Sequence, residues 1–183
     1  MLNYEAYDDM HLIELAQNGD QTSFNALYDR YFSTVYNRVR YTIPEQDVDD
    51  VTQEVFIAML KSLSSFQGRS KFSTWLRTLI NRQVAGYYRS REHKIKEEPM
   101  LEGNHLSQNS FAGDIKHNER ISIRAAIKEL PSHYQEVILL RFAEGLQFAE
   151  ISDELKQNPE AVKSLFRRAI ATLRTQLEKD YDA

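Results

Sequence analysis

The 183-residue sequence contains no cysteine. It therefore has no disulfide framework, no thiolate metal site and no cysteine nucleophile. No apolar run approaches the roughly 18 residues that a membrane-spanning helix requires. The N-terminus lacks the basic start and apolar stretch of a signal peptide. We expect a cytoplasmic protein without membrane insertion.

Glycine and proline are also scarce, with six and four residues. This argues against β structure with many turns and favours helices. Apolar residues recur at spacings of three and four along most of the chain, as on one face of a helix. The pattern dissolves between about residues 97 and 118. The sequence predicts an all-α protein with two small helical domains, 1–96 and 119–183, joined by a flexible linker over 97–118.

Catalytic motifs are missing as well. The five histidines are scattered, and none lies four residues from another. There is no zinc-protease motif, glycine-rich phosphate loop or nucleophile elbow. The acidic cluster between Asp47 and Glu54 is better interpreted as a solvated or partner-binding helix face than as a cation site. We expect no enzyme activity, no catalytic residue, no cofactor or metal and no small-molecule substrate.

Charge is unevenly distributed along the chain. The net charge is −4. Residues 1–60 hold eleven acids and three bases, for −8, whereas residues 61–96 hold one acid and nine bases, for +8. Residues 156–174 hold one acid and five bases, for +4. Two separate basic blocks could meet a polyanion at two places.

The second basic block lies in a pattern typical of a helix-turn-helix. A short apolar helix around Ile151 is followed by a turn at 156–158 and a longer helix that begins near Pro159. In such a unit the second helix enters the major groove of duplex DNA. Lys163, Ser164, Arg167 and Arg168 lie off the apolar stripe of that helix, so we expect them to contact DNA.

The first basic block is interleaved with aromatic residues. Cationic side chains beside aromatic rings suit single-stranded DNA, because they neutralise the backbone and stack on unpaired bases. An ordinary solvated helix face would have the same composition, so composition alone leaves both interpretations open.

Two motifs, in order, resemble the extracytoplasmic-function (ECF) sigma factors. Residues 47–56 (DVDDVTQEVF) and 66–76 (FQGRSKFSTWL) resemble the second conserved domain of this family. Residues 129–142 (ELPSHYQEVILLRF) and 161–169 (AVKSLFRRA) resemble its fourth domain. The resemblance covers about residues 10–95 and 119–176.

The resemblance implies a bacterial transcription initiation factor that binds core RNA polymerase and directs it to promoter DNA. It assigns polymerase binding to Asp47, Asp50, Gln53 and Glu54. It also implies recognition and melting of the minus-ten element, with an unpaired base captured by the loop at about 65–71. The predicted single-strand contacts are Ser65, Phe66, Gln67, Arg69, Ser70, Lys71, Trp75, Arg77 and Arg82.

The resemblance assigns the minus-thirty-five element to Lys163, Ser164, Arg167 and Arg168, and it implies an anti-sigma factor as a further partner. The sequence departs from the family pattern at Lys156, where a glycine is common, and at Leu165, where an arginine is usual. Two alternatives stay open: a stand-alone helix-turn-helix regulator, and a protein that binds polymerase without directing initiation.

Overall fold

A computed structural model describes residues 6–97 and 123–181, with side chains for 6–91 and 123–178. Helices are the regular elements of these ranges, and no strand occurs within them. The predicted all-α class is confirmed. The chain divides into two compact units, and the boundary between them, after Ala85 and before Gly86, lies inside a long helix. The predicted linker, except for Glu97, lies outside the described residues.

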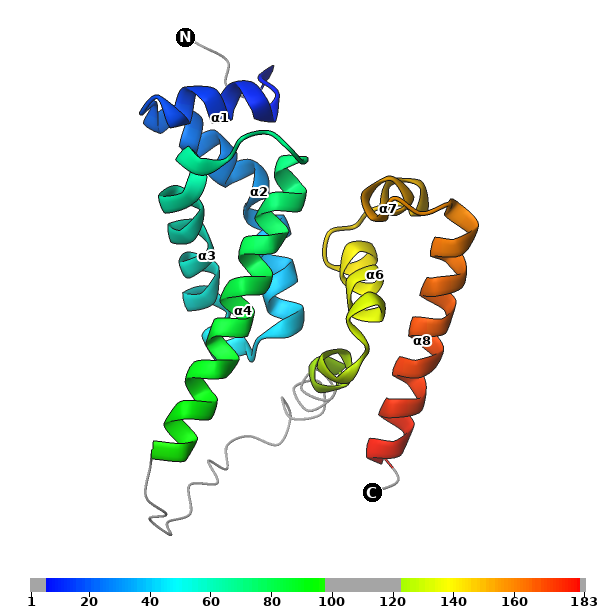
Figure 1. Ribbon diagram of the computed structural model, residues 1–183. Helices are drawn as coiled ribbons and strands as arrows, with labels where there is room; N and C mark the ends of the chain where they lie inside the picture. The colour runs from blue at the N-terminus through cyan, green and yellow to red at the C-terminus, as the bar shows by residue number, and fades with distance from the viewer. Residues whose placement is uncertain (1–5, 98–122, 182–183) are drawn as a thin grey trace, which may run out of the picture. The chain divides into compact units, whose positions relative to one another are not determined.

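The first unit is built from α1 (Asp9–Gln17), α2 (Gln21–Thr42), α3 (Val48–Ser62) and the first half of α4 (Phe72–Glu97), as Figure 1 shows. α1 and α2 begin at aspartates whose carboxylates accept backbone N–H groups. Asp8 accepts from His11 at 2.8 Å and Asp20 from Ser23 at 2.8 Å. Each bond satisfies an N–H that the helix itself leaves unpaired.

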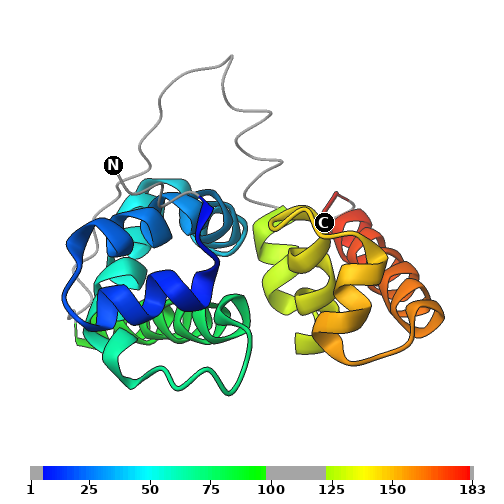
Figure 2. The ribbon, with the colours of Figure 1, turned by 90° about the horizontal axis from the view of Figure 1, so that it is seen from above.

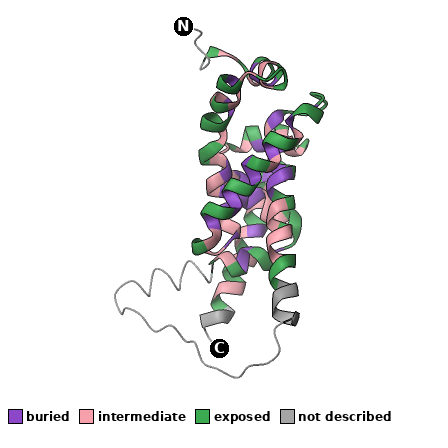
Figure 3. Ribbon diagram, turned by 90° about the vertical axis from the view of Figure 1, so that its left-hand side faces the viewer, coloured by how far each residue is buried: buried purple, intermediate pink, exposed green. Residues whose placement is uncertain are grey.

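The core of the first unit is the shared apolar side of these helices. Figure 3 colours the buried residues purple along the helices. Burying such side chains stabilises the fold by about 1.5–3 kcal/mol each. The fully buried members include Leu12, Leu27, Val35, Val39, Val55, Met59, Leu76 and Ile80.

Short 3₁₀ turns adjust the two ends of α3. η2 (Glu45–Asp47) precedes it, and η3 (Leu63–Ser65) leads into the loop before α4. Pro44 precedes η2 with a backbone φ of −54° and ψ of 144°. Gly68 has a φ of +68°, which glycine adopts without the clash of a Cβ atom. This allows the loop to turn.

The second unit contains a helical segment over 123–129, α6 (Ser132–Phe142), α7 (Phe148–Leu155) and α8 (Pro159–Tyr181). α6 and α7 both pack against α8, and Figure 2 shows these helices from above. The shared core is formed by Val137, Leu140, Ile151, Val162 and Ala169, each fully buried or nearly so.

Candidate nucleic-acid and protein interfaces

The loop between η3 and α4 carries most of the predicted single-strand contacts on its surface. These exposed residues are Ser65, Gln67, Arg69, Ser70 and Lys71. The two serine hydroxyls form hydrogen bonds with backbone carbonyls. Ser65 donates to the Ser62 carbonyl at 2.7 Å, and Ser70 donates to the Lys71 carbonyl at 3.2 Å. The loop therefore presents two cations and several hydrogen-bonding groups to solvent.

An aromatic cluster lies beneath this loop. The Phe66 ring centroid lies 5.6 Å from that of Phe72 and 5.2 Å from that of Trp75. Edge-to-face and tilted ring pairs at these distances add to the stabilisation from burial. Phe66 is only 7% exposed, so its ring supports the loop from inside, whereas Trp75 is half-buried.

Of the two arginines among the predicted contacts on α4, one is covered and one is open. Arg77 is only 7% exposed, whereas Arg82 is exposed. Arg82 follows Trp75 by seven residues, two helical turns, so both lie on one side of α4. The structure thus places Trp75 beside the loop and Arg82 exposed two turns further along α4. It buries Phe66 and Arg77, a difference that composition could not show.

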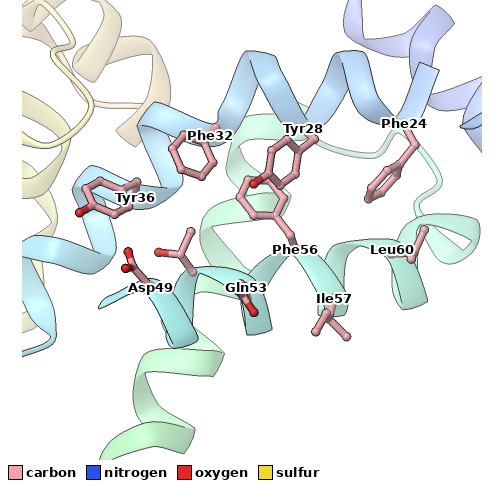
Figure 4. Close-up of a pocket in the computed structure, with 10 residues that line it drawn as sticks. Phe24, Tyr28, Phe32, Tyr36, Asp49, Gln53, Phe56, Ile57 and Leu60 are labelled. Carbon is pink, nitrogen blue, oxygen red and sulfur yellow. The ribbon is translucent and has the colours of Figure 1, made fainter. Parts of the chain in front are cut away.

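A groove about 440 Å³ in volume runs between α2 and α3 (Figure 4). One wall is an aromatic row spaced by four residues on α2, formed by Phe24, Tyr28, Phe32 and Tyr36. The ring of Phe32 contacts those of Tyr28 and Tyr36. Tyr28 and Phe32 also contact Phe56 of α3, with the Tyr28 and Phe56 centroids 4.3 Å apart. Tyr28, within this row, is 36% exposed.

The other wall carries exposed apolar and polar residues of α3. Ile57 and Leu60 are 49% and 59% exposed, and Asp49 and Gln53 line the same groove. Of the predicted polymerase contacts, Gln53 lines the groove, Asp50 and Glu54 are exposed on α3, and Asp47 at its N-terminus is half-buried. The apolar residues of the groove were missed; the four-residue aromatic spacing on α2 was their only sequence signal.

The helix-turn-helix is formed as predicted. α7 is followed by Lys156, which has a left-handed backbone with φ 52° and ψ 42°. Asn158 then begins α8 by accepting the Ala161 N–H at 2.7 Å. Leu165, where an arginine is usual in the ECF family, is 8% exposed and belongs to the core.

The four predicted contacts of α8 lie beside its buried stripe. Lys163, Arg167 and Arg168 are exposed and Ser164 is half-buried. Lys163 pairs with Glu160 at 2.8 Å, and this hydrogen bond lowers the pKa of the Glu160 carboxyl. Exposed pairs of this kind contribute little to stability, so Lys163 can exchange the carboxylate for a phosphate at small cost.

Two negative findings apply to the described ranges. No cluster of three histidine, aspartate or glutamate side chains is placed there to hold a metal ion. None of the helices described is both long and apolar enough to span a bilayer.

Comparison with protein families assigns both units. Residues 27–94 match the Sigma-70 region 2 model, and residues 120–173 match the Sigma-70 region 4 model. The exposed loop belongs to the first match, as does the α2–α3 groove apart from Phe24. α8 belongs to the second match as far as residue 173. The fold and its surfaces thus define a protein with sigma regions 2 and 4.

Characterised relatives narrow the class. The ECF RNA polymerase sigma-E factor of Escherichia coli K12 is 30% identical over 158 residues, covering 81% of this chain and 83% of that protein. The ECF RNA polymerase sigma factor BldN of Streptomyces coelicolor is 31% identical over 176 residues, covering 93% of this chain; the chain spans 66% of BldN. The chain belongs to the ECF RNA polymerase sigma factors, which act in transcription initiation, and a stand-alone regulator is not favoured.

Solved structures agree with this assignment. CnrH, in complex with the cytosolic domain of CnrY, superposes with a TM-score of 0.63 and 25% identity, covering 94% of this chain and 98% of CnrH. The sigma factor RpoE of Bartonella quintana shares the fold at a TM-score of 0.50 and 15% identity, covering 83% of this chain and 96% of that one.

Proposed function

We propose that this sigma factor binds core RNA polymerase through α3 and the groove beside it. The groove offers exposed apolar surface at Ile57 and Leu60, and Asp49 lines it. Asp50 and Glu54 add negative charge as exposed residues of the same helix. An apolar centre with a charged rim is typical of protein interfaces. A helical partner surface with basic residues and apolar anchors would complement both features.

The loop at 65–71 and the adjoining side of α4 bind the opened minus-ten strand. Arg69, Lys71 and Arg82 are placed to neutralise phosphates, and Trp75 offers a partly open ring for stacking. Phe66 acts in this site as the buried support of the loop. An unpaired base costs a few kcal/mol to extrude, which contacts with the loop would recover.

α8 binds the minus-thirty-five element as duplex DNA. Its N-terminal half carries Lys163, Ser164, Arg167 and Arg168 on the accessible side, where a recognition helix meets base edges and phosphates. A protein with two DNA-binding modules on one chain gains effective concentration when both engage the same promoter.

Regulation by a protein partner is part of the proposal. CnrH is seen in complex with the cytosolic domain of CnrY, and the exposed apolar groove of this chain is a surface that an anti-sigma factor would cover. We place the protein in the cytoplasm, where the polymerase is, and assign it no catalysis of its own.

The observation that carries the proposal is that three chemically different surfaces lie open on one chain: an apolar and acidic groove, a basic loop and a basic recognition helix. The test is transcription by purified core polymerase from a template library randomised over the promoter region. We expect transcripts that depend on this chain and share two sequence elements. Specific duplex binding without polymerase, and no chain-dependent transcript, would instead support a stand-alone regulator.

A further inference from the structure

The C-terminal end of α1 has a tightly defined geometry. Gly19 takes a φ of +94°, its N–H donates to the Ala16 carbonyl at 3.0 Å, and the Asp20 N–H donates to the Leu15 carbonyl at 3.0 Å. This pair of bonds is the Schellman ending of a helix. It fixes the position from which the side chain of Gln17, the last residue of α1, extends.

The Gln17 amide reaches the loop that precedes α4. Its nitrogen donates to the carbonyls of Leu63 and Phe66, both at 2.9 Å. These acceptors lie 46 and 49 residues further along the chain, at the start of η3 and at the beginning of the loop. Both N–H groups of the amide are therefore used to hold one loop.

A second contact between α1 and the loop is steric. Gly68 lies so close to Met10 that a Cβ atom added there would be 3.1 Å from the Met10 methyl carbon. α1 is in turn held by α2, because Asp9 pairs with Arg30 at 2.7 Å and accepts a hydrogen bond from Tyr31. Burial and this bond raise the pKa of Tyr31, so its hydroxyl remains a donor at neutral pH.

A hollow of about 540 Å³ lies where α1 meets the loop. Its walls include His11, Glu14 and Gln17 of α1 and Phe66 and Gln67 of the loop. A shift of the loop away from α1 would move the last two of these residues and change the shape of the hollow. The Gln17 bonds thus couple the position of the loop to the space beside it.

We propose that Gln17 is a positioning residue of the single-strand site, fixing the loop against α1 and so maintaining the hollow that receives an unpaired base. The inference rests on the proposed role of the loop in strand opening. It adds α1, which lies outside the basic block, to the parts of the molecule that determine base preference.

The test uses full-length variants with core polymerase and the randomised template library. Gln17→Glu keeps the size of the side chain but replaces the donors with an acceptor that repels the two carbonyls. We expect transcript yield to fall about tenfold and base preference in the minus-ten element to flatten, with the minus-thirty-five preference unchanged. Gln17→Met, which only removes the donors, should give the same pattern with a smaller loss.

Gln21→Glu is the matched control, since it makes the same change at an exposed residue four positions on. It should leave yield and both preferences as in the parent. Templates with a pre-opened minus-ten segment should restore the transcript yield of Gln17→Glu but not its base preference. If Gln17 only stabilised the fold, yield and preference would not separate in this way. Thermal unfolding shows whether Gln17→Glu is folded. If it is not, the base preference of Gln17→Met tests the inference.

The inference is overturned if Gln17→Met and a folded Gln17→Glu keep the parental minus-ten preference, or if both elements lose preference equally. If the parent itself produces no chain-dependent transcript, the proposed function has failed instead, so the two failures are distinguishable.

Discussion

Lys156 is the one non-glycine residue with a positive φ among those the structure describes. A side chain with a Cβ atom costs about 1–2 kcal/mol in this left-handed conformation. The turn of the helix-turn-helix therefore forms despite local strain, and it is held by the Gln157 N–H, which donates to the Ser152 carbonyl at 3.1 Å.

Replacement of Lys156 by glycine should therefore stabilise the second unit by about 1 kcal/mol, because the strain is removed. Chemical denaturation of the parent and the variant measures this difference. Gln157→Gly, at a neighbouring position without a positive φ, is the control and should not stabilise. Equal or lower stability of Lys156→Gly would contradict the strain argument.

Asp20 gives a pH dependence at the residue scale. Hydrogen bonds from the Ser23 hydroxyl and N–H lower the pKa of its carboxyl, so the charged form is favoured in the folded state. The stability that the Asp20 carboxylate contributes is therefore fully present above its pKa in the unfolded chain, about 3.9. It is lost as the pH falls through the lower pKa of the folded state.

The parent should accordingly exceed Asp20→Asn in stability at pH 7, and the difference should shrink below about pH 4. Urea denaturation at pH 7 and pH 3 tests this sign. A difference that stays constant or grows toward pH 3 would exclude a charged cap.

At the scale of the element, α3 has two functions on opposite sides. Val51, Val55 and Met59 build the core, while Ile57 and Leu60 remain open on the groove. Apolar residues that the fold leaves uncovered on a helix mark an interaction surface when they lie together.

The double change Ile57→Ser and Leu60→Ser should weaken binding to core polymerase about thirtyfold, which corresponds to about 2 kcal/mol for two half-exposed side chains. Titration of labelled protein with core enzyme measures the affinity. Thermal stability should be unchanged, since neither residue is in the core. Ile123→Ser, at an exposed residue of the second unit, is the control; parental affinity in the double variant would refute the groove as the docking site.

α8 allows a similar test for duplex DNA. In the complex with core polymerase, Arg167→Ala should weaken binding to the minus-thirty-five element. Discrimination should fall by about 1–3 kcal/mol if Arg167 contacts a base, or the salt slope by about 1 if it contacts phosphate. Arg174 lies two turns further along the same side of α8, and Arg174→Ala should weaken DNA binding less. An unchanged slope together with unchanged preference would remove Arg167 from the DNA interface.

Local signals in the sequence account for much of the helix pattern. The caps at Asp20 and Asn158 and the buried stripes of α3 and α8 follow from hydrogen bonding and helical spacing over a few residues. The groove did not follow, because whether Tyr28 or Leu60 is covered depends on how α2 and α3 pack. Phe66 was predicted as a DNA contact because it lies among basic residues in the sequence. That pattern is the same whether the ring is exposed or buried, so the sequence could not show that Phe66 is covered.

At the scale of the whole molecule, the net charge of −4 is an average over separate acidic and basic parts of the chain. Negative charge is concentrated in the part of the chain that includes α3, and positive charge in the loop, α4 and α8. A uniformly basic protein would bind DNA unaided. If the acidic part engages the polymerase as we propose, this distribution predicts that productive DNA binding depends on the polymerase.

A footprint on a template selected from the library tests this central claim most directly, because one experiment reports duplex protection and unpaired bases together. With core polymerase and this chain, the account predicts protection of the minus-thirty-five element and reactive unpaired bases in the minus-ten element. Without polymerase it predicts neither. Sequence-specific protection by the chain alone, or protection with polymerase but no unpaired bases, would contradict the account.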